Sequence, residues 1–225
     1  MAPIRNVIFD LDGTLVDSLP GIARSVEAAL LSCGLPPLAR DLKPLIGPPI
    51  RVILSTVSGV SKPRRLNDLE QAFRLSYDSG GWRGTVCQEG AADLLGQLRA
   101  SGIGLWVVTN KPADATRKIL NELKLASFFQ EAACRDSRVP TFRSKADVLA
   151  DLLQRHALEG STCLMVGDTL EDGEAAAAAG MRCAIVPHGY WAEQVYPLPS
   201  GCRRVSGWEE VTRLCAVALS PKERN

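Results

Sequence analysis

Short apolar runs alternate along the chain with longer segments whose apolar residues recur every three or four positions. The short runs lack helical periodicity and therefore predict buried strands. They occupy 7–9, 103–109, 162–167 and 182–187. The periodic segments predict helices at about 18–33, 64–79, 89–100, 113–124, 145–157, 172–179 and 208–219. This alternation is typical of a parallel sheet covered by helices, so we expect an α/β fold with a Rossmann-like core.

The alternation is interrupted directly after the first strand. Between about 16 and 83 the pattern indicates helices and no strand, and 36–62 contains short apolar pieces broken by proline and glycine. The predicted organisation is therefore a core domain formed by 1–15 and 84–225. An all-helical cap domain at 16–83 is inserted into it.

The composition excludes several functional classes. The 225 residues carry 26 basic and 25 acidic side chains, so no global charge favours a nucleic-acid or membrane partner. Seven scattered cysteines, without a Cys-x-x-Cys pair, indicate free thiols in a reducing compartment. Neither a signal peptide nor a run of about 20 apolar residues is recognisable. We expect a cytoplasmic protein, as a monomer or homodimer.

The first strand ends in a pattern that points to chemistry. Asp10 and Asp12 follow the apolar run 7–9, and Gly13 then allows a sharp turn. An aspartate at the carboxyl end of a buried strand is costly unless a cation or a reaction requires it. The pattern indicates metal-assisted chemistry on an anion.

Two later strands also end in polar residues. Thr109 and Asn110 follow one strand, and Asp168 follows another with Asp172 one helical turn beyond it. The carboxyl ends of parallel strands meet at one edge of a sheet, so these groups are expected to converge.

Taken in order, these motifs resemble the haloacid dehalogenase superfamily. They are an Asp-x-Asp-Gly-Thr sequence beginning at Asp10, a strand ending in Thr109, a downstream lysine, and a Gly-Asp-x-x-x-Asp sequence beginning at Gly167. The segments Thr109-Asn110-Lys111-Pro112 and Leu45-Ile46-Gly47-Pro48 look most like those of phosphoglycolate phosphatases. The resemblance covers the predicted core and the position of the insert.

The resemblance assigns roles to both residues of the first pair. Asp10 corresponds to the nucleophile that attacks phosphorus and forms an aspartyl-phosphate. Asp12 corresponds to the general acid that protonates the leaving oxygen and later activates water. The family also uses the backbone carbonyl of the Asp12 position as a metal ligand.

The resemblance further implies a Mg²⁺ site and a phosphate site. Asp10, Asp12 and Asp168 would supply the protein oxygens around Mg²⁺. Asp172 would act through water or by holding the lysine, with direct ligation and a plain first-turn helix carboxylate as alternatives. Thr109 would bind the phosphoryl oxygens, and Asn110 could contribute through its amide.

The remaining assignments depart further from the family pattern. Relatives usually have Lys-Pro before the helix that precedes the Gly-Asp strand, whereas this chain has Arg143-Ser144-Lys145. We prefer Lys145 over Arg143 as the phosphate-site cation. In the cap, Gly47 and Arg51 are candidates for contacting the substrate, because a Gly-Pro-Pro loop followed by arginine can bind an anion. A solvated arginine and a plain loop are the alternatives.

The sequence thus predicts a Mg²⁺-dependent phosphatase acting on a small phosphorylated metabolite, with phosphoglycolate as the first candidate. The alternatives are a sugar-phosphate mutase, a nucleotidase or pyrophosphatase, and a non-catalytic binding protein on the same scaffold. Release of phosphate, transfer between sugar positions, and failure to bind Mg²⁺ distinguish them.

Overall fold

The core of the computed structural model is one parallel sheet, and the structure describes residues 2–191, 193–194 and 196–216. Six strands lie in the order β5–β4–β1–β6–β7–β8. They are β1 (Asn6–Phe9), β4 (Gly104–Thr109), β5 (Glu131–Cys134), β6 (Cys163–Gly167), β7 (Arg182–Ile185) and β8 (Cys202–Arg204). The predicted α/β class is confirmed.

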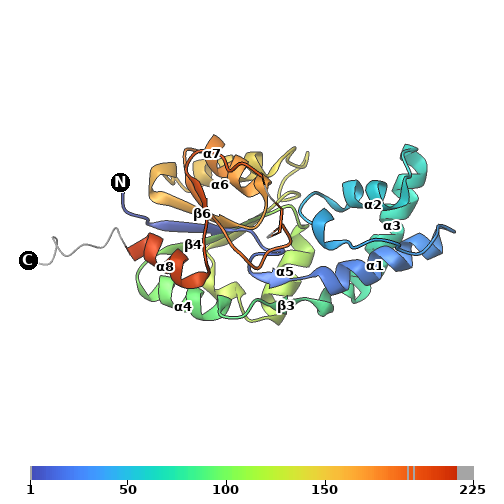
Figure 1. Ribbon diagram of the computed structural model, residues 1–225, viewed down its shortest axis with the longest axis horizontal. Helices are drawn as coiled ribbons and strands as arrows, with labels where there is room; N and C mark the ends of the chain where they lie inside the picture. The colour runs from blue at the N-terminus through green and yellow to red at the C-terminus, as the bar shows by residue number, and fades with distance from the viewer. Residues whose placement is uncertain (1, 192, 195, 217–225) are drawn as a thin grey trace, which may run out of the picture.

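Helices cover both faces of this sheet (Figure 1). One face carries α4 (Ala91–Ala100), α5 (Ala113–Glu122) and α8 (Trp208–Ala216), and the other carries α6 (Lys145–Arg155) and α7 (Leu170–Ala178). In β1, Val7 and Phe9 pack on the first face and Ile8 on the second. A strand buried on both sides reads as a continuous apolar run, which explains the pattern at 7–9.

A helical segment extends beyond the carboxyl ends of the central strands (Figure 1). It contains α1 (Leu19–Ser32), α2 (Ile50–Ser58) and α3 (Pro63–Ser79). The buried face of α3 comprises Leu66, Leu69, Phe73 and Tyr77, which are the residues whose spacing predicts that helix. Short 3₁₀ helices lie at Lys43–Leu45, Gly81–Gly84, Ala126–Phe128 and Gly160–Thr162. The division into 1–15, 16–83 and 84–225 stays a prediction.

Four strands were not expected from the sequence. Two are the edge strands β5 and β8, whose alanine, cysteine and arginine residues have little apolar strand character. The other two, β2 (Val16–Asp17) and β3 (Val86–Cys87), form a separate antiparallel pair. Two residues are too few to produce a periodic pattern. The expectation of no strand between about 16 and 83 was therefore wrong at β2, and β3 lies outside that range.

The remaining expectations concern the last helix, the cysteines and membranes. The final helix is described to Ala216, and the predicted positions 217–219 lie outside the described residues. The seven cysteines are free thiols, and four of them are buried: Cys134, Cys163, Cys183 and Cys215. No helix in the described part of the chain combines the length and apolar character needed to cross a membrane.

Helix α6 begins with a reciprocal cap that fixes its first residue, Lys145. The Ser144 hydroxyl accepts the Asp147 amide at 3.1 Å, and the Asp147 carboxylate accepts the Ser144 amide at 3.1 Å. Replacing such a serine by alanine leaves helix-end amides without a partner.

We therefore expect Ser144→Ala to lower the free energy of unfolding by about 1 kcal/mol, measured by urea denaturation. Ser79→Ala provides the control, because Ser79 is the exposed last residue of α3 and caps no amide. Its change should stay within about 0.5 kcal/mol. Equal effects of the two substitutions would contradict the role of the cap.

Candidate active site

Three neighbouring strands bring polar side chains to one edge of the sheet. Asp10 follows β1, Thr109 ends β4, and Asp168 follows β6, and β1 pairs with both of the other strands. Each of the three residues is at most 3% exposed. The convergence expected from the sequence is present.

Three carboxylates form the centre of this edge. Asp10, Asp168 and Asp172 each place one oxygen within 4.8 Å of the others. Burial raises the pKa of Asp10 to about 7, with the negative charges of Asp172 and Asp12 adding to the increase against the attraction of Lys145. Burial, together with the charges of Asp172 and Asp10, also raises the pKa of Asp168 well above its usual value. The cluster is a concentrated negative charge with little access to water.

One buried lysine partly compensates that charge. The Lys145 ammonium lies 3.0 Å from Asp10 Oδ1 and 2.8 Å from Asp172 Oδ1. Burial disfavours its charge, but the attraction of Asp10 and Asp172 outweighs burial and raises the pKa of Lys145. Arg143, the alternative cation, is exposed, and its only hydrogen bond among the described residues is accepted by its carbonyl from Arg135. The geometry favours Lys145.

Both oxygens of Asp172 already have partners. Oδ1 pairs with Lys145, and Oδ2 accepts hydrogen bonds from the amides of Asp168 and Thr169 and from the Thr169 hydroxyl. These contacts also close the first turn of α7. They support the expectation that Asp172 holds the lysine and favour it over direct ligation.

The residues of this cluster fit a hard divalent cation. Asp10 Oδ1 is buried, and the Lys145 ammonium 3.0 Å away is its one polar contact within the described chain. Three carboxylates against one ammonium leave a buried negative charge, which a cation would neutralise. Oxygen donors of this kind suit Mg²⁺ or a similar ion. Asp10 and Asp168 are the side chains best placed to hold it, because Asp168 Oδ1 has only one long contact, with the Thr14 hydroxyl at 3.4 Å, in the described chain.

Asp12 faces a different environment from Asp10. Lys111 Nζ lies 2.9 Å from each Asp12 oxygen, and the Ser18 hydroxyl donates to Asp12 Oδ1 at 2.5 Å. Burial disfavours the charge on Lys111, but the contacts with Asp12 and Tyr77 together outweigh burial and raise the lysine's pKa. The Asp12 side chain therefore lies outside the carboxylate cluster, so only its backbone carbonyl stays a predicted metal ligand.

Lys111 was not among the predicted site residues. Lys111 lies two positions after Thr109, at a strand end that the sequence analysis had already assigned to the site. This proximity could have indicated that Lys111 also belongs to the site. The Thr109 hydroxyl accepts the Lys111 amide at 3.2 Å. With no acceptor for its own proton in the described chain, this hydroxyl can donate to a bound anion.

Asn110 connects the loop at Gly47, in the helical segment, to Glu171 in the core. Its Nδ2 donates to the Gly47 carbonyl at 3.0 Å and to Glu171 Oε2 at 2.8 Å. The side-chain amide protons are therefore committed to protein partners. If Asn110 contacts the substrate as predicted, its backbone amide is the donor that could do so.

Tyr190 is a further residue that the sequence analysis missed. Its amide donates to Asp168 Oδ2 at 2.7 Å. Its hydroxyl accepts the Ser18 amide and donates to Asp17. Tyr190 therefore links the carboxylate cluster to the start of α1. The one signal in the sequence was its position in the turn that follows the buried strand β7.

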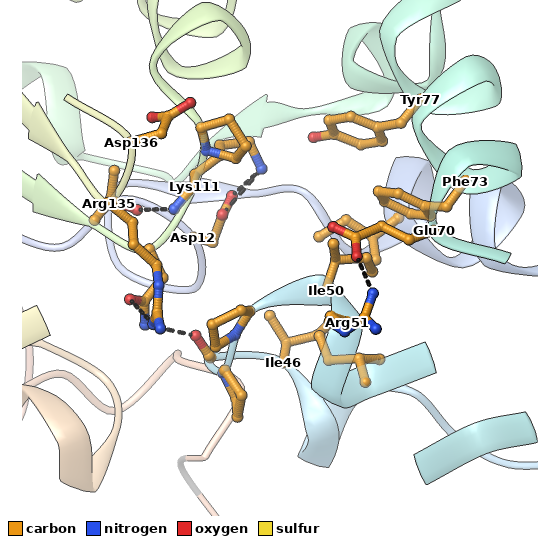
Figure 2. A pocket seen from close by; sticks show the side chains of 18 of the residues that line it. Asp12, Ile46, Ile50, Arg51, Glu70, Phe73, Tyr77, Lys111, Arg135 and Asp136 are labelled. Atoms are coloured by element: carbon orange, nitrogen blue, oxygen red, sulfur yellow. Dashed lines mark hydrogen bonds and ion pairs between the residues drawn. The ribbon is translucent and has the colours of Figure 1, made fainter. Parts of the chain in front are cut away.

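A cavity of about 430 Å³ opens in front of this edge, between the sheet and the helical segment (Figure 2). Asp10, Asp12, Thr109, Asn110 and Lys111 line its core side, and residues 46–51 line part of the opposite side. Arg51 lines the cavity and donates to Asn67 and Glu70. The structure thus gathers the predicted residues around one cavity, with Asp168, Asp172 and Lys145 behind its wall.

Comparison with known proteins agrees with this geometry. Residues 7–186 match the family model for haloacid dehalogenase-like hydrolases. The chain belongs to the haloacid dehalogenase-like hydrolase family. Its resemblance to that family, stated above from four motifs, is confirmed.

Individual relatives of this hydrolase differ in their names. A phosphoglycolate phosphatase of Pseudomonas putida is 32% identical over 83% of the chain and 70% of its own length. A 5'-nucleotidase of Pseudomonas aeruginosa is 34% identical over 84% of the chain and 85% of its own length. The solved structure of Mycobacterium tuberculosis protein tyrosine kinase A has a TM-score of 0.81 and 31% identity, covering 95% of this chain and 98% of that one.

The packing of this hydrolase's site leaves no room for a side chain at Gly13. Its φ is +84°, and a Cβ there would lie 2.4 Å from Asp168 Oδ2 and 2.8 Å from the Tyr190 ring. Gly34 offers a matched control, because its φ is +69° and nothing lies within 4 Å of a Cβ.

We expect Gly34→Ala to cost about 1–2 kcal/mol from backbone strain alone. Gly13→Ala should cost at least about 1 kcal/mol more, because Asp168 and Tyr190 must move. Urea denaturation of both variants measures the difference. Equal losses of stability would show that the site tolerates a methyl group at Gly13.

Proposed function

We propose that this protein is a Mg²⁺-dependent phosphatase that hydrolyses a small organic phosphomonoester through an aspartyl-phosphate on Asp10. The observation that carries the proposal is that two carboxylates at the end of the same strand have different surroundings. Asp10 lies in the buried cluster with Lys145, and Asp12 lies two residues away against Lys111. One position suits a nucleophile and the other suits proton transfer.

In the proposed first step, an Asp10 carboxylate oxygen forms a bond to phosphorus as the bond between phosphorus and the ester oxygen breaks. Asp12 donates its proton to the departing oxygen, so that a neutral alcohol leaves. The Thr109 hydroxyl, which lines the cavity, would hold a phosphoryl oxygen, and Lys145, 3.0 Å from Asp10 Oδ1, would offset negative charge at the point of attack. The carboxylate of Asp10 needs its negative charge for this attack.

In the second step, water attacks the phosphorus of the aspartyl-phosphate and Asp12 accepts the water's proton. Inorganic phosphate leaves and Asp10 is restored. Lys111 Nζ and the Ser18 hydroxyl both donate to the Asp12 carboxylate. Their contacts also hold Asp12 facing the cavity.

Bound Mg²⁺ would supply neutralisation of the charge on phosphate, which otherwise repels a carboxylate nucleophile. The buried cluster and the raised pKa of Asp10 support a cation at this place. Asp10 and Asp168 would hold it, with the Asp12 carbonyl as the further ligand that the family resemblance suggests. The phosphoglycolate phosphatase relative supports a small phosphorylated metabolite as substrate.

Asp10→Asn should lower the rate of p-nitrophenyl phosphate hydrolysis with Mg²⁺ by at least about 10³-fold, because an amide is a far weaker nucleophile. The far-UV circular dichroism spectrum should be unchanged. Asp93→Asn, at an exposed position of α4, serves as the matched control and should retain full activity. Retained turnover in Asp10→Asn would exclude the aspartyl-phosphate mechanism.

Removal of the metal tests the other half of the proposal. Dialysis against a chelator should abolish hydrolysis, and added Mg²⁺ should restore it. Mg²⁺ at about 100 times its Kd should raise the Tm of the free protein by roughly 5–10 °C. Asp168→Asn should remove this shift, whereas the exposed change Asp114→Asn should not. Activity and Tm that do not respond to Mg²⁺ would contradict the assignment.

A further inference from the structure

The wall of the cavity that lies opposite the carboxylates is largely apolar. Figure 2 shows the side chains that converge on it. Its apolar members are Ile22, Ile46, Ile50, Ile53 and Phe73. The cavity volume of about 430 Å³ lies within the range of sites that enclose drug-sized ligands, and a two-carbon acid would leave most of it to water.

The charges on this wall are paired within the protein. Glu70 lies 3.0 Å from the Arg51 guanidinium and 3.6 Å from that of Arg74. Arg51 also donates to Asn67 at 2.7 Å. Both bonds of Arg51 come from Nη1, and a free carboxylate on the substrate, as in phosphoglycolate, would have to compete with Glu70 for the charge of this arginine.

One polar atom of the wall is only weakly engaged by the protein. The Tyr77 hydroxyl is buried and lies near the Lys111 ammonium, but it makes no hydrogen bond of good geometry within the described chain. The Tyr77 ring stacks on Phe73 with centroids 5.4 Å apart, and the Lys111 ammonium lies 5.1 Å from its centroid. In Figure 2 the hydroxyl points across the cavity toward the Lys111–Asp12 pair. Unlike the other unpaired buried hydroxyls, this one belongs to a residue that lines the cavity, so it is available to a group bound there.

We propose that the cavity binds the uncharged alcohol part of a phosphomonoester with an apolar face, and that the Tyr77 hydroxyl hydrogen-bonds to the bound ester. This inference rests on the proposed phosphatase function. The apolar wall packs against the alcohol, while the phosphoryl group lies at Asp10. Tyr77 then acts as a positioning residue beside the oxygen that Asp12 protonates.

Three esters separate the effect of the wall from that of leaving-group chemistry. They are 2-phenylethyl phosphate, ethyl phosphate and phosphoglycolate. The first two release alcohols of similar basicity, so a difference in kcat/KM measures contact with the ring. We expect 2-phenylethyl phosphate to exceed ethyl phosphate by about tenfold or more, and to exceed phosphoglycolate as well. Phosphoglycolate as the best of the three would overturn the inference.

Tyr77→Phe tests the hydroxyl. Without it, kcat/KM for 2-phenylethyl phosphate should fall about two- to tenfold, the range of one hydrogen bond. The Tm of the free protein should stay the same or rise, because an unpaired buried hydroxyl has been removed. A structural role would instead lower the Tm, and unchanged kcat/KM would exclude Tyr77 as a positioning residue.

Thr116→Val is the matched control for Tyr77→Phe. Thr116 lies on α5 outside the cavity, and its buried hydroxyl also has no hydrogen-bond partner in the described chain. This variant should retain the kcat/KM of the wild type. A loss equal to that of Tyr77→Phe would show that burial of an unpaired hydroxyl, and not its place in the cavity, explains the effect.

Calorimetric binding of the two uncharged-alcohol esters to Asp10→Asn separates the two proposals. Tighter binding of 2-phenylethyl phosphate than of ethyl phosphate supports the cavity assignment, even if the wild type hydrolyses neither ester. That combination would refute the phosphatase function alone. Equal binding of the two esters would refute the cavity assignment, whatever the activity.

Discussion

The burial of three carboxylates at the end of two adjacent strands is the constraint on which the rest of the site depends. Asp10, Asp168 and Asp172 repel one another in a region with little water, and Lys145 offsets only part of their charge. Much of the surrounding structure supports this arrangement. The first turn of α7 is bonded to Asp172, and the cap of α6 fixes Lys145 at the start of its helix. Local helix geometry and buried charge are therefore coupled.

The contacts of Asp12 come from both the core and the helical segment. Asp12 comes from the core, and its partners are Lys111 from the core and Ser18 at the start of α1. Tyr190 joins the same helix start to Asp168, and Asn110 bonds to the Gly47 loop. A movement of the helical segment would change the contacts of both aspartates. Shared hydrogen bonds thus connect the helical segment to Asp12 and Asp168.

The central fold was predictable because burial on both faces leaves a clear signal. Strands β1, β4, β6 and β7 read as apolar runs, and the face of α3 follows helical spacing. The edge strands β5 and β8 were missed because they are covered less completely and need fewer apolar residues. The pair β2–β3 was missed because it depends on a pairing between distant parts of the chain, which no local pattern records.

The sequence alone determined which strand ends carry polar side chains, since aspartates directly after apolar runs stand out. The family resemblance then assigned expected roles to Asp10, Asp12 and Asp168 and favoured Lys145. Only the tertiary structure decided which partners these residues have. Lys111, Tyr190 and Tyr77 lie far from Asp12 or Asp168 in sequence, and their roles arise from distances across the fold. Type and spacing of residues record local burial, but the assembly of a cavity depends on contacts that no spacing encodes.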